Sequence, residues 1–295
     1  MPAIAVTTKI GCKVGCNYCP QGMLVRAYRK KDENLTMSTD TFKICVDRVP
    51  SHVFIHFAGM SEPWLNPHCT EMLLYANEKG HPIRVFTTLV DMPASDIAKI
   101  EHIPFEAFEV HLPSAEGAEN IPVDEKYLAT LRALEESKIK AEYHVHGKSI
   151  HPEVKKVVGA IAHWTVFSRA QNLTGEERVF STKRRRRGEI GCRRLDYNVL
   201  LPNGDVLVCC MDYGMKHVIG NLLSCSYEDL FRSAEFKRIK KGFREEPEDT
   251  LCRYCDTYAY DVSLKAKILN LPFRFFPLKD RIKSKLRTLR YQWFN

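Results

Sequence analysis

The sequence lacks any hydrophobic run long enough to cross a membrane. No stretch approaches the roughly 18 apolar residues that a spanning helix needs. Residues 1–6 carry neither a basic segment nor a long apolar core, so a secretory signal is not expected. The chain also shows no internal repeat and no low-complexity segment. We therefore expect a cytoplasmic protein.

Acidic residues are fewer than basic ones: 36 Asp and Glu oppose 44 Lys and Arg, which gives a net charge of +8. A basic balance suggests anionic partners. Much of the excess is local, in residues 183–187 and in about the last thirty residues, which argues against a broad nucleic-acid surface. An apolar share of 44% excludes a disordered chain, and 295 residues suffice for one large and one small domain.

Cysteine, in contrast, is abundant, and its eleven copies point to metal rather than disulfides in a cytoplasmic chain. Cys12, Cys16 and Cys19 stand so close together that their thiolates can converge on one metal centre. A four-iron cluster usually takes four cysteines, so three leave one iron open to bind a small molecule and pass it an electron. Zinc is the alternative, although its short cysteine pair is usually joined by a distant second pair.

The spacing Cys-x3-Cys-x2-Cys, with Tyr18 just before the third cysteine, resembles the signature of the radical S-adenosylmethionine (SAM) enzymes. The resemblance implies that the three cysteines hold a 4Fe-4S cluster and that Tyr18 belongs to the SAM site. In that family SAM chelates the open iron, and the reduced cluster cleaves SAM to a 5′-deoxyadenosyl radical that takes a hydrogen atom from substrate. An external electron donor such as flavodoxin or ferredoxin is then implied.

Short β-rich runs alternate with helical patterns from residue 4 to about residue 173, which predicts a parallel sheet. Six such units resemble the partial (β/α)6 barrel of the radical SAM family, so an α/β fold is expected over residues 1–175. The cysteine run follows the first strand and is expected at the mouth of the barrel, where parallel barrels place their active sites. The predicted strands are 4–8, 52–57, 83–88, 105–112, 141–146 and 164–168, and helices are expected to begin near Ser38, Asn66–Pro67, Pro122 and Pro152.

Polar side chains alternate with apolar ones on three of these strands, at His56, at Glu109 and His111, and at His144 and His146. Successive side chains of a strand point to opposite faces. If the apolar set packs against the helices, the polar set faces the barrel lumen, where a substrate would lie. His111 and His146 are the catalytic candidates from this pattern. The alternative is that they are hydrogen-bonded core residues without contact to a ligand.

The second strand is followed by Ala-Gly-Met-Ser-Glu-Pro, residues 58–63, which resembles the Gly-Gly-Glu-Pro element that binds the amino group of SAM in the family. Glycine permits a close backbone approach, and a carboxylate suits an ammonium. The expected SAM-binding residues here are Gly59, Met60, Ser61 and Glu62.

The sixth predicted strand ends at Ser168 and Arg169, which complete the expected SAM site. Arginine suits bidentate recognition of the SAM carboxylate. The alternative for Arg169 is a surface residue that caps the strand edge.

The pattern changes after residue 188. Two β-rich runs flank Asn203-Gly204, the strongest short signal for a hairpin. The cysteines around this hairpin resemble the twitch form of the SPASM extension, which implies a small α+β domain over residues 188–262 with one auxiliary 4Fe-4S cluster, the second of the chain. A zinc ribbon is the alternative. The expected ligands are Cys192, Cys209, Cys252 and Cys255, whereas Cys210 should point away from them.

Two basic segments remain. Residues 183–187 are best interpreted as a solvated linker, with a clamp for phosphate or anionic lipid as the alternative. Residues 263–295 form a basic amphipathic tail rich in aromatic side chains. Docking of this tail on the protein is the commoner outcome, and peripheral contact with the inner face of a membrane is the alternative.

The sequence therefore predicts a radical SAM enzyme, a dehydrogenase-type oxidoreductase acting on a small polar substrate of the carbohydrate or aminocyclitol kind. The auxiliary cluster would accept the second electron, as the resemblance to aminocyclitol dehydrogenases implies. Three alternatives stay open: maturation of a ribosomal peptide, epimerisation with a thiol such as Cys45 or Cys225 as hydrogen donor, and a zinc-stabilised binding module. No nucleic-acid partner is expected.

Overall fold

The computed structural model describes residues 1–117, 119–147, 149–159, 187–245, 248–255 and 258–262. The predicted sixth strand with Ser168 and Arg169, the basic residues 183–186 and the tail over residues 263–295 lie outside the described residues.

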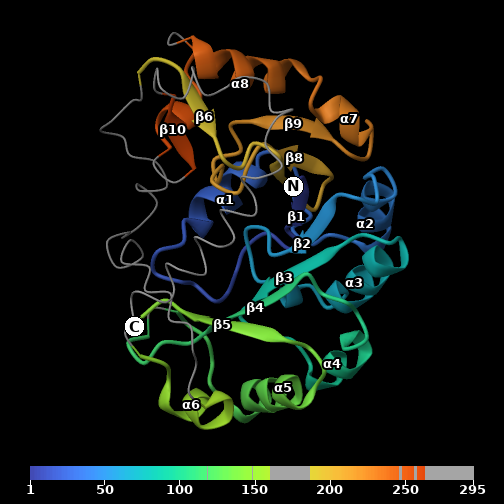
Figure 1. Ribbon diagram of the computed structural model, residues 1–295, viewed down its shortest axis with the longest axis vertical. Helices are drawn as coiled ribbons and strands as arrows, with labels where there is room; N and C mark the ends of the chain where they lie inside the picture. Colours follow the sequence, from blue (N-terminus) through green and yellow to red (C-terminus); the bar gives the residue numbers. More distant parts are fainter. Residues whose placement is uncertain (118, 148, 160–186, 246–247, 256–257, 263–295) are drawn as a thin grey trace, which may run out of the picture.

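A curved parallel sheet forms the first half of the protein. Its strands follow one another in the order β5-β4-β3-β2-β1, and every neighbouring pair is parallel. Figure 1 shows the helices α2 to α5 along the outer side of this sheet. The α/β partial barrel predicted from the alternation is therefore confirmed. The strands are β1 (Ala3–Val6), β2 (Phe54–Phe57), β3 (Ile83–Thr87), β4 (Ala107–Leu112) and β5 (Ala141–Val145).

Two helices of this half begin at a side-chain cap, Ser38 for α2 (Thr39–Val46) and Asp124 for α5 (Glu125–Glu136). Ser38 caps α2 by accepting the Thr41 N–H at 3.0 Å, as predicted. The start predicted at Asn66–Pro67 lies too early, because α3 begins at Cys69. The Asn66 side chain accepts the His68 N–H at 3.0 Å just before this helix, and its amide also donates to the carbonyls of Thr8 and Met37. The helices are α1 (Gln21–Tyr28), α2 (Thr39–Val46), α3 (Cys69–Glu78), α4 (Ala94–Ile100), α5 (Glu125–Glu136) and α6 (Pro152–Val158), with a 3-10 turn η1 (Pro63–Leu65) before α3.

The main hydrophobic core lies between the sheet and its helices. Ile55, Phe57 and Val85 of the strands are completely buried against helix residues such as Phe42 and Leu131. Each such side chain contributes about 1.5–3 kcal/mol through burial. Because the apolar positions of each strand are used on this side, the polar positions between them face the lumen.

The C-terminal region continues the same sheet. Strand β7 (Tyr197–Leu200) lies parallel to β1, and β8 (Asp205–Leu207) and β9 (Val218–Asn221) follow as antiparallel neighbours. Gly204, with a φ of +83°, forms the turn between β7 and β8, so the predicted hairpin is confirmed. A second small sheet pairs β6 (Ile190–Cys192) with β10 (Ala259–Asp261). The region with the distal cysteines is thus anchored directly to the first strand of the barrel.

Two helices follow β9 in the C-terminal region. α7 (Tyr227–Leu230) begins with a capping box at Ser226. Ser233 then caps α8 (Ala234–Arg244) by accepting the Phe236 N–H at 3.1 Å, which explains the break between the two helices. The 3-10 turn η4 (Leu251–Arg253) contains Cys252, and Cys255 follows it after Tyr254. In the part of the chain that the structure describes, no helix is long and apolar enough to span a membrane.

Candidate iron–sulfur and SAM site

Cys12, Cys16 and Cys19 lie in the loop that joins β1 to α1, at the C-terminal end of the first strand. The loop is tightly folded, since the Cys19 N–H donates to the Cys16 carbonyl at 2.9 Å. Burial, together with the charges of Cys19 and Cys12, raises the pKa of the Cys16 thiol to about 12. The three sulfurs therefore lie within electrostatic reach of one another in a half-buried loop.

The surroundings of these sulfurs suit thiolate ligands of an iron–sulfur cluster. Main-chain hydrogen bonds from Glu62, Val14 and Gly15 stabilise the Cys12 thiolate against the effect of burial. Hydrogen bonds to cluster sulfurs are a usual feature of such sites. Among the described residues, no group of three or more His, Cys, Asp or Glu side chains could hold a single metal ion. The donors in this loop are three cysteine thiols, and thiolates are the usual ligands of an iron–sulfur cluster, so the donor set fits one.

Gln21, the first residue of α1, joins the cysteine loop to the loop after β2. Its side-chain carbonyl accepts the Cys12 N–H at 3.3 Å, and its amide donates to the Met60 carbonyl. Sequence reasoning missed Gln21, because a single glutamine after a cysteine run carries no recognisable signal. The consequence is that the two predicted SAM-binding loops are held side by side.

The loop at residues 59–61 lies directly on the end of β1. Gly59 has a φ of +54°, and a Cβ placed there would come within 2.5 Å of the Thr7 hydroxyl oxygen. The Met60 N–H donates to Thr7 Oγ1 at 3.0 Å, and the Ser61 hydroxyl donates to the Lys9 carbonyl at 2.5 Å. Only glycine allows this close approach, so the geometry explains the glycine of the predicted motif.

The Glu62 carboxylate forms all of its hydrogen bonds within the protein. One carboxylate oxygen accepts from the Trp64 N–H at 3.2 Å and the Thr87 hydroxyl at 2.7 Å, and the other from the Thr88 N–H at 2.5 Å and its hydroxyl at 2.8 Å. Burial raises the pKa of Glu62 despite these bonds. A carboxylate has about four acceptor positions, and all four are filled. Glu62 therefore ties the end of β2 to the end of β3.

A second buried carboxylate lies near the cysteine loop. Glu119 Oε1 is 3.2 Å from His111 Nε2 on β4, while Glu119 Oε2 accepts from the Ser114 N–H and hydroxyl at 3.3 and 3.0 Å. Burial opposes the ionisation of Glu119, but the bonds to His111 and Ser114 outweigh it and lower the pKa. Sequence reasoning missed Glu119 because it lies on the loop after β4, outside the strand alternation.

His146 completes this group. Its ring centroid lies 4.0 Å from that of His111 and 5.3 Å from that of Tyr18, which stands in the cysteine loop. Burial, followed by the charge of His111, lowers the pKa of His146 to about 3, so its imidazole is neutral near pH 7. The two predicted catalytic histidines are thus in contact with each other and lie beside the predicted cluster loop.

The four distal cysteines also come together. Burial, together with the charges of Cys192 and Cys255, raises the pKa of the Cys252 thiol to about 12. Cys209 is buried beside Cys252 and packs against the main core, whereas its neighbour Cys210 packs against a separate apolar cluster. Cys210 still lies close enough to Cys255 for the charge of Cys255 to raise the pKa of the Cys210 thiol.

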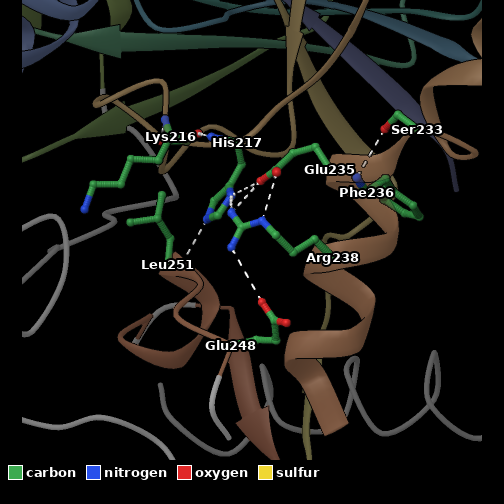
Figure 2. A network of polar contacts seen from close by, with 9 residues as sticks. Lys216, His217, Ser233, Glu235, Phe236, Arg238, Glu248 and Leu251 are labelled. Carbon is green, nitrogen blue, oxygen red and sulfur yellow. Dashed lines mark hydrogen bonds and ion pairs between the residues drawn. The ribbon is translucent and has the colours of Figure 1, made fainter. Parts of the chain in front are cut away.

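A network of polar contacts holds the last cysteine pair in place, and Figure 2 shows its members. His217 Nε2 accepts the Leu251 N–H at 3.0 Å, so the ring proton is on Nδ1, which lies 2.5 Å from Glu235 Oε1. Arg238 of α8 donates to the same carboxylate at 2.8 and 2.9 Å and lies 3.9 Å from Glu248. The turn before Cys252 is therefore fixed to α8 and to the loop after β8.

One side chain from the C-terminal region reaches the first cysteine group. The Tyr213 hydroxyl lies 4.0 Å from Cys19 Sγ, and burial raises the pKa of this tyrosine. The charge of Cys210 also raises the pKa of Tyr213. It thus lies between the two cysteine groups.

Comparisons with known proteins agree with this arrangement. The family model of SPASM, an iron-sulfur cluster-binding domain, matches residues 192–256. No curated protein matches the chain. BtrN in complex with AdoMet and 2-DOIA has the same fold, with a TM-score of 0.59 and 18% identity over 87% of this chain and 93% of BtrN.

Two further solved structures are similar. anSMEcpe with bound AdoMet has a TM-score of 0.54 and 13% identity over 87% of this chain and 88% of its own. Streptococcus suis SuiB bound to S-adenosylmethionine has a TM-score of 0.55 and 12% identity over 86% of this chain and 70% of its own. The predicted resemblance is confirmed: the chain has the fold of the radical SAM enzymes and carries a SPASM iron–sulfur domain in its C-terminal region.

Proposed function

We propose that this chain is a radical SAM oxidoreductase that oxidises a small polar substrate of the carbohydrate or aminocyclitol kind. The observation that carries the proposal is the position of the histidine pair. His111 and His146, with Glu119, lie beside Tyr18 of the loop that holds the three cysteines. A substrate in the lumen would thus meet a proton acceptor and the predicted radical site together.

The cysteines would hold the cofactors. Cys12, Cys16 and Cys19 would bind one 4Fe-4S cluster, and Cys192, Cys209, Cys252 and Cys255 would bind an auxiliary one. When bound, the first cluster with SAM supplies a radical that removes a hydrogen atom from a substrate carbon, and the second supplies an electron acceptor. A flavodoxin or ferredoxin would serve as the reductant.

The loops around β1 and β2 would hold SAM. Gln21 ties the main chain of residues 59–61 to the cysteine loop, and the carbonyls of Gly59 and Ser61 would meet the SAM ammonium there. Glu62 would act by orienting this loop, since its own oxygens are occupied. Ser168 and Arg169 remain the proposed partners of the SAM carboxylate, together with Tyr18 at the cysteine loop.

The histidine pair would take the substrate proton. His146 is neutral near pH 7 and can accept a hydroxyl proton. Its low pKa favours transfer of the proton to His111, whose imidazolium the Glu119 carboxylate would stabilise at 3.2 Å. Loss of a hydrogen atom from carbon, a proton from oxygen and one electron converts a secondary alcohol into a ketone.

The likeness to BtrN, whose complex contains AdoMet and 2-DOIA, supports a small substrate and extends over 93% of that chain. Peptide modification is the second candidate, because SuiB bound to its precursor peptide SuiA has a TM-score of 0.54 with this chain. The chain covers 69% of that SuiB structure.

Anaerobic incubation of the iron-loaded protein with SAM and dithionite tests the proposal. We expect 5′-deoxyadenosine from the wild type and none from Cys16→Ala. Cys225→Ser, which changes a cysteine outside both groups, should keep the activity. An iron-replete wild type that forms no 5′-deoxyadenosine would overturn the proposal, and turnover of a peptide but of no aminocyclitol would favour the second candidate.

A further inference from the structure

We propose that Arg84 and Arg194, with His56 and Tyr197, form an oxyanion-binding subsite in the barrel lumen, and that this subsite takes a phosphate or carboxylate group of the substrate. The inference rests on the proposed function in one respect, namely that the lumen receives the substrate. It adds a charge requirement to the substrate, because a neutral sugar or cyclitol would leave the subsite empty.

Strand register places these residues on the lumen face. His56 of β2 lies beside Arg84 of β3 in the parallel register. Their chain neighbours Ile55 and Val85 are completely buried in the main core, so His56 and Arg84 point to the other side of the sheet. Tyr197 of β7 is the register partner of Ala3 on β1, which brings a third strand to the same place.

Aromatic rings hold the two guanidinium groups without neutralising them. The Arg84 guanidinium carbon lies 4.5 Å from the centroid of the Phe54 ring, and that of Arg194 lies 4.8 Å from the centroid of the Tyr197 ring. Tyr197 in turn forms a hydrogen bond with His56 Nδ1 through its hydroxyl. Stacking on an aromatic face orients the planar donor fork of arginine and leaves its N–H groups available.

The positive charge at this point has no counter-ion in the described part of the chain. There, neither Arg84 nor Arg194 forms an ion pair, and Arg84 Nε and His56 Nε2 are buried polar atoms without a hydrogen-bond partner. Glu109, a carboxylate on the neighbouring strand β4, lies 3.4 Å from His144 instead. Burial and then the charges of both arginines lower the pKa of His56 to about 4. Arg194 is exposed, whereas Arg84 is half-buried with its Nε unpaired, so the charge of Arg84 is unfavourable there and an oxyanion would relieve it.

The depth of the subsite favours the substrate over SAM as the source of the anion. His56 is the third of four residues in β2 and Arg84 the second of five in β3, whereas the cysteine loop follows the end of β1. A substrate bound between the arginine subsite and the cysteine loop would place its anionic group deep in the lumen and its reactive carbon toward His111 and His146. SAM carries a carboxylate of the same chemistry, so the two sources must be separated by experiment.

Calorimetric titration of the cluster-loaded protein with inorganic phosphate tests the proposal. We expect one phosphate per chain in the wild type and at least tenfold weaker binding in Arg84→Met. Arg84→Lys, which keeps the charge but loses the fork, should fall between the two. The control is Arg132→Met, which removes an exposed arginine of α5 paired with Glu125 and should bind within twofold of the wild type.

The titration is repeated with saturating SAM. Phosphate binding that persists supports a substrate subsite, whereas binding abolished by SAM would assign the arginines to the SAM carboxylate and overturn the proposal. Equal binding by Arg84→Met and Arg132→Met would also overturn it. If Arg84→Met does not fold, Arg84→Lys and Arg194→Met provide the same comparison. A wild type that binds phosphate but does not cleave SAM would refute the proposed enzyme and leave the anion site standing.

Discussion

Replacing Gly59 by alanine should destabilise the protein more than the same change at any open glycine turn. The new Cβ would lie 2.5 Å from Thr7 Oγ1 and 2.6 Å from the Val6 carbonyl oxygen, both of which belong to the end of β1. The φ of +54° adds about 1–2 kcal/mol of backbone strain for any residue with a Cβ. Overpacking against backbone adds about 1–3 kcal/mol. We therefore expect a loss of about 2–5 kcal/mol in the free energy of unfolding.

Gly80 provides the matched control. Its φ of +77° imposes the same backbone strain, but no atom lies within 4 Å of a Cβ placed there. Gly80→Ala should thus lose only about 1–2 kcal/mol. In a chain of this size about 1 kcal/mol corresponds to roughly 2 °C in Tm, so thermal melts should separate the two variants by about 2–6 °C. Gly59→Ala should also bind SAM more weakly, because the main chain at residues 59–61 must move. Equal melting temperatures of the two variants would refute the close packing of this loop on β1.

Three further changes test other parts of the account. Tyr213→Phe removes the hydroxyl that lies 4.0 Å from Cys19 Sγ, so a hydrogen bond of about 0.5–1.5 kcal/mol is lost. The midpoint potential of the N-terminal cluster should then be lower by about 20–60 mV in a redox titration followed by EPR, and an unchanged potential would contradict this contact. His56 has a folded-state pKa of about 4, below the value of about 6.5 in the unfolded chain, so the unfolded state binds the proton first and stability falls as the pH drops. In phosphate-free buffer, the free energy of unfolding should therefore decrease by about 1.4 kcal/mol less in His56→Asn than in the wild type when the pH drops from 7.5 to 5.5, as measured by denaturant titration at both pH values. An equal decrease in the two proteins would refute the burial of a neutral imidazole. His217→Ala removes the acceptor of the Leu251 N–H, so the EPR signal of the auxiliary cluster should weaken while that of the N-terminal cluster stays, and loss of both signals together would contradict the local role of this network.

The sequence predicted the parts of the fold that depend on local periodicity. Five of the parallel strands and the Asn203-Gly204 hairpin follow from alternation and turn chemistry, which a single segment can reveal. Asn66 shows the limit of this reasoning. Its side chain accepts the His68 N–H just before α3, as a helix cap would, but its amide also satisfies two carbonyls from distant segments, which no local pattern can show.

The cysteines of the candidate site could be named in advance because their spacing is specific. Gln21 and Tyr213 could not, because each acts through a contact with a residue far away in the sequence, and Glu119 could not because it lies on a loop outside the strand alternation. The parallel pairing of β7 with β1 was also missed, since a twitch-like region was expected as a separate domain. That pairing brings Tyr213 to the first cysteine loop.

The central claim is that the three N-terminal thiolates hold an iron–sulfur cluster with one iron open to SAM. EPR spectroscopy of the dithionite-reduced protein, recorded with and without SAM, tests it most directly. The account predicts a signal whose g values shift when SAM is added, and the loss of this SAM-sensitive signal in Cys16→Ala. A wild-type signal that SAM leaves unaltered, in protein with a full complement of iron and sulfide, would contradict it.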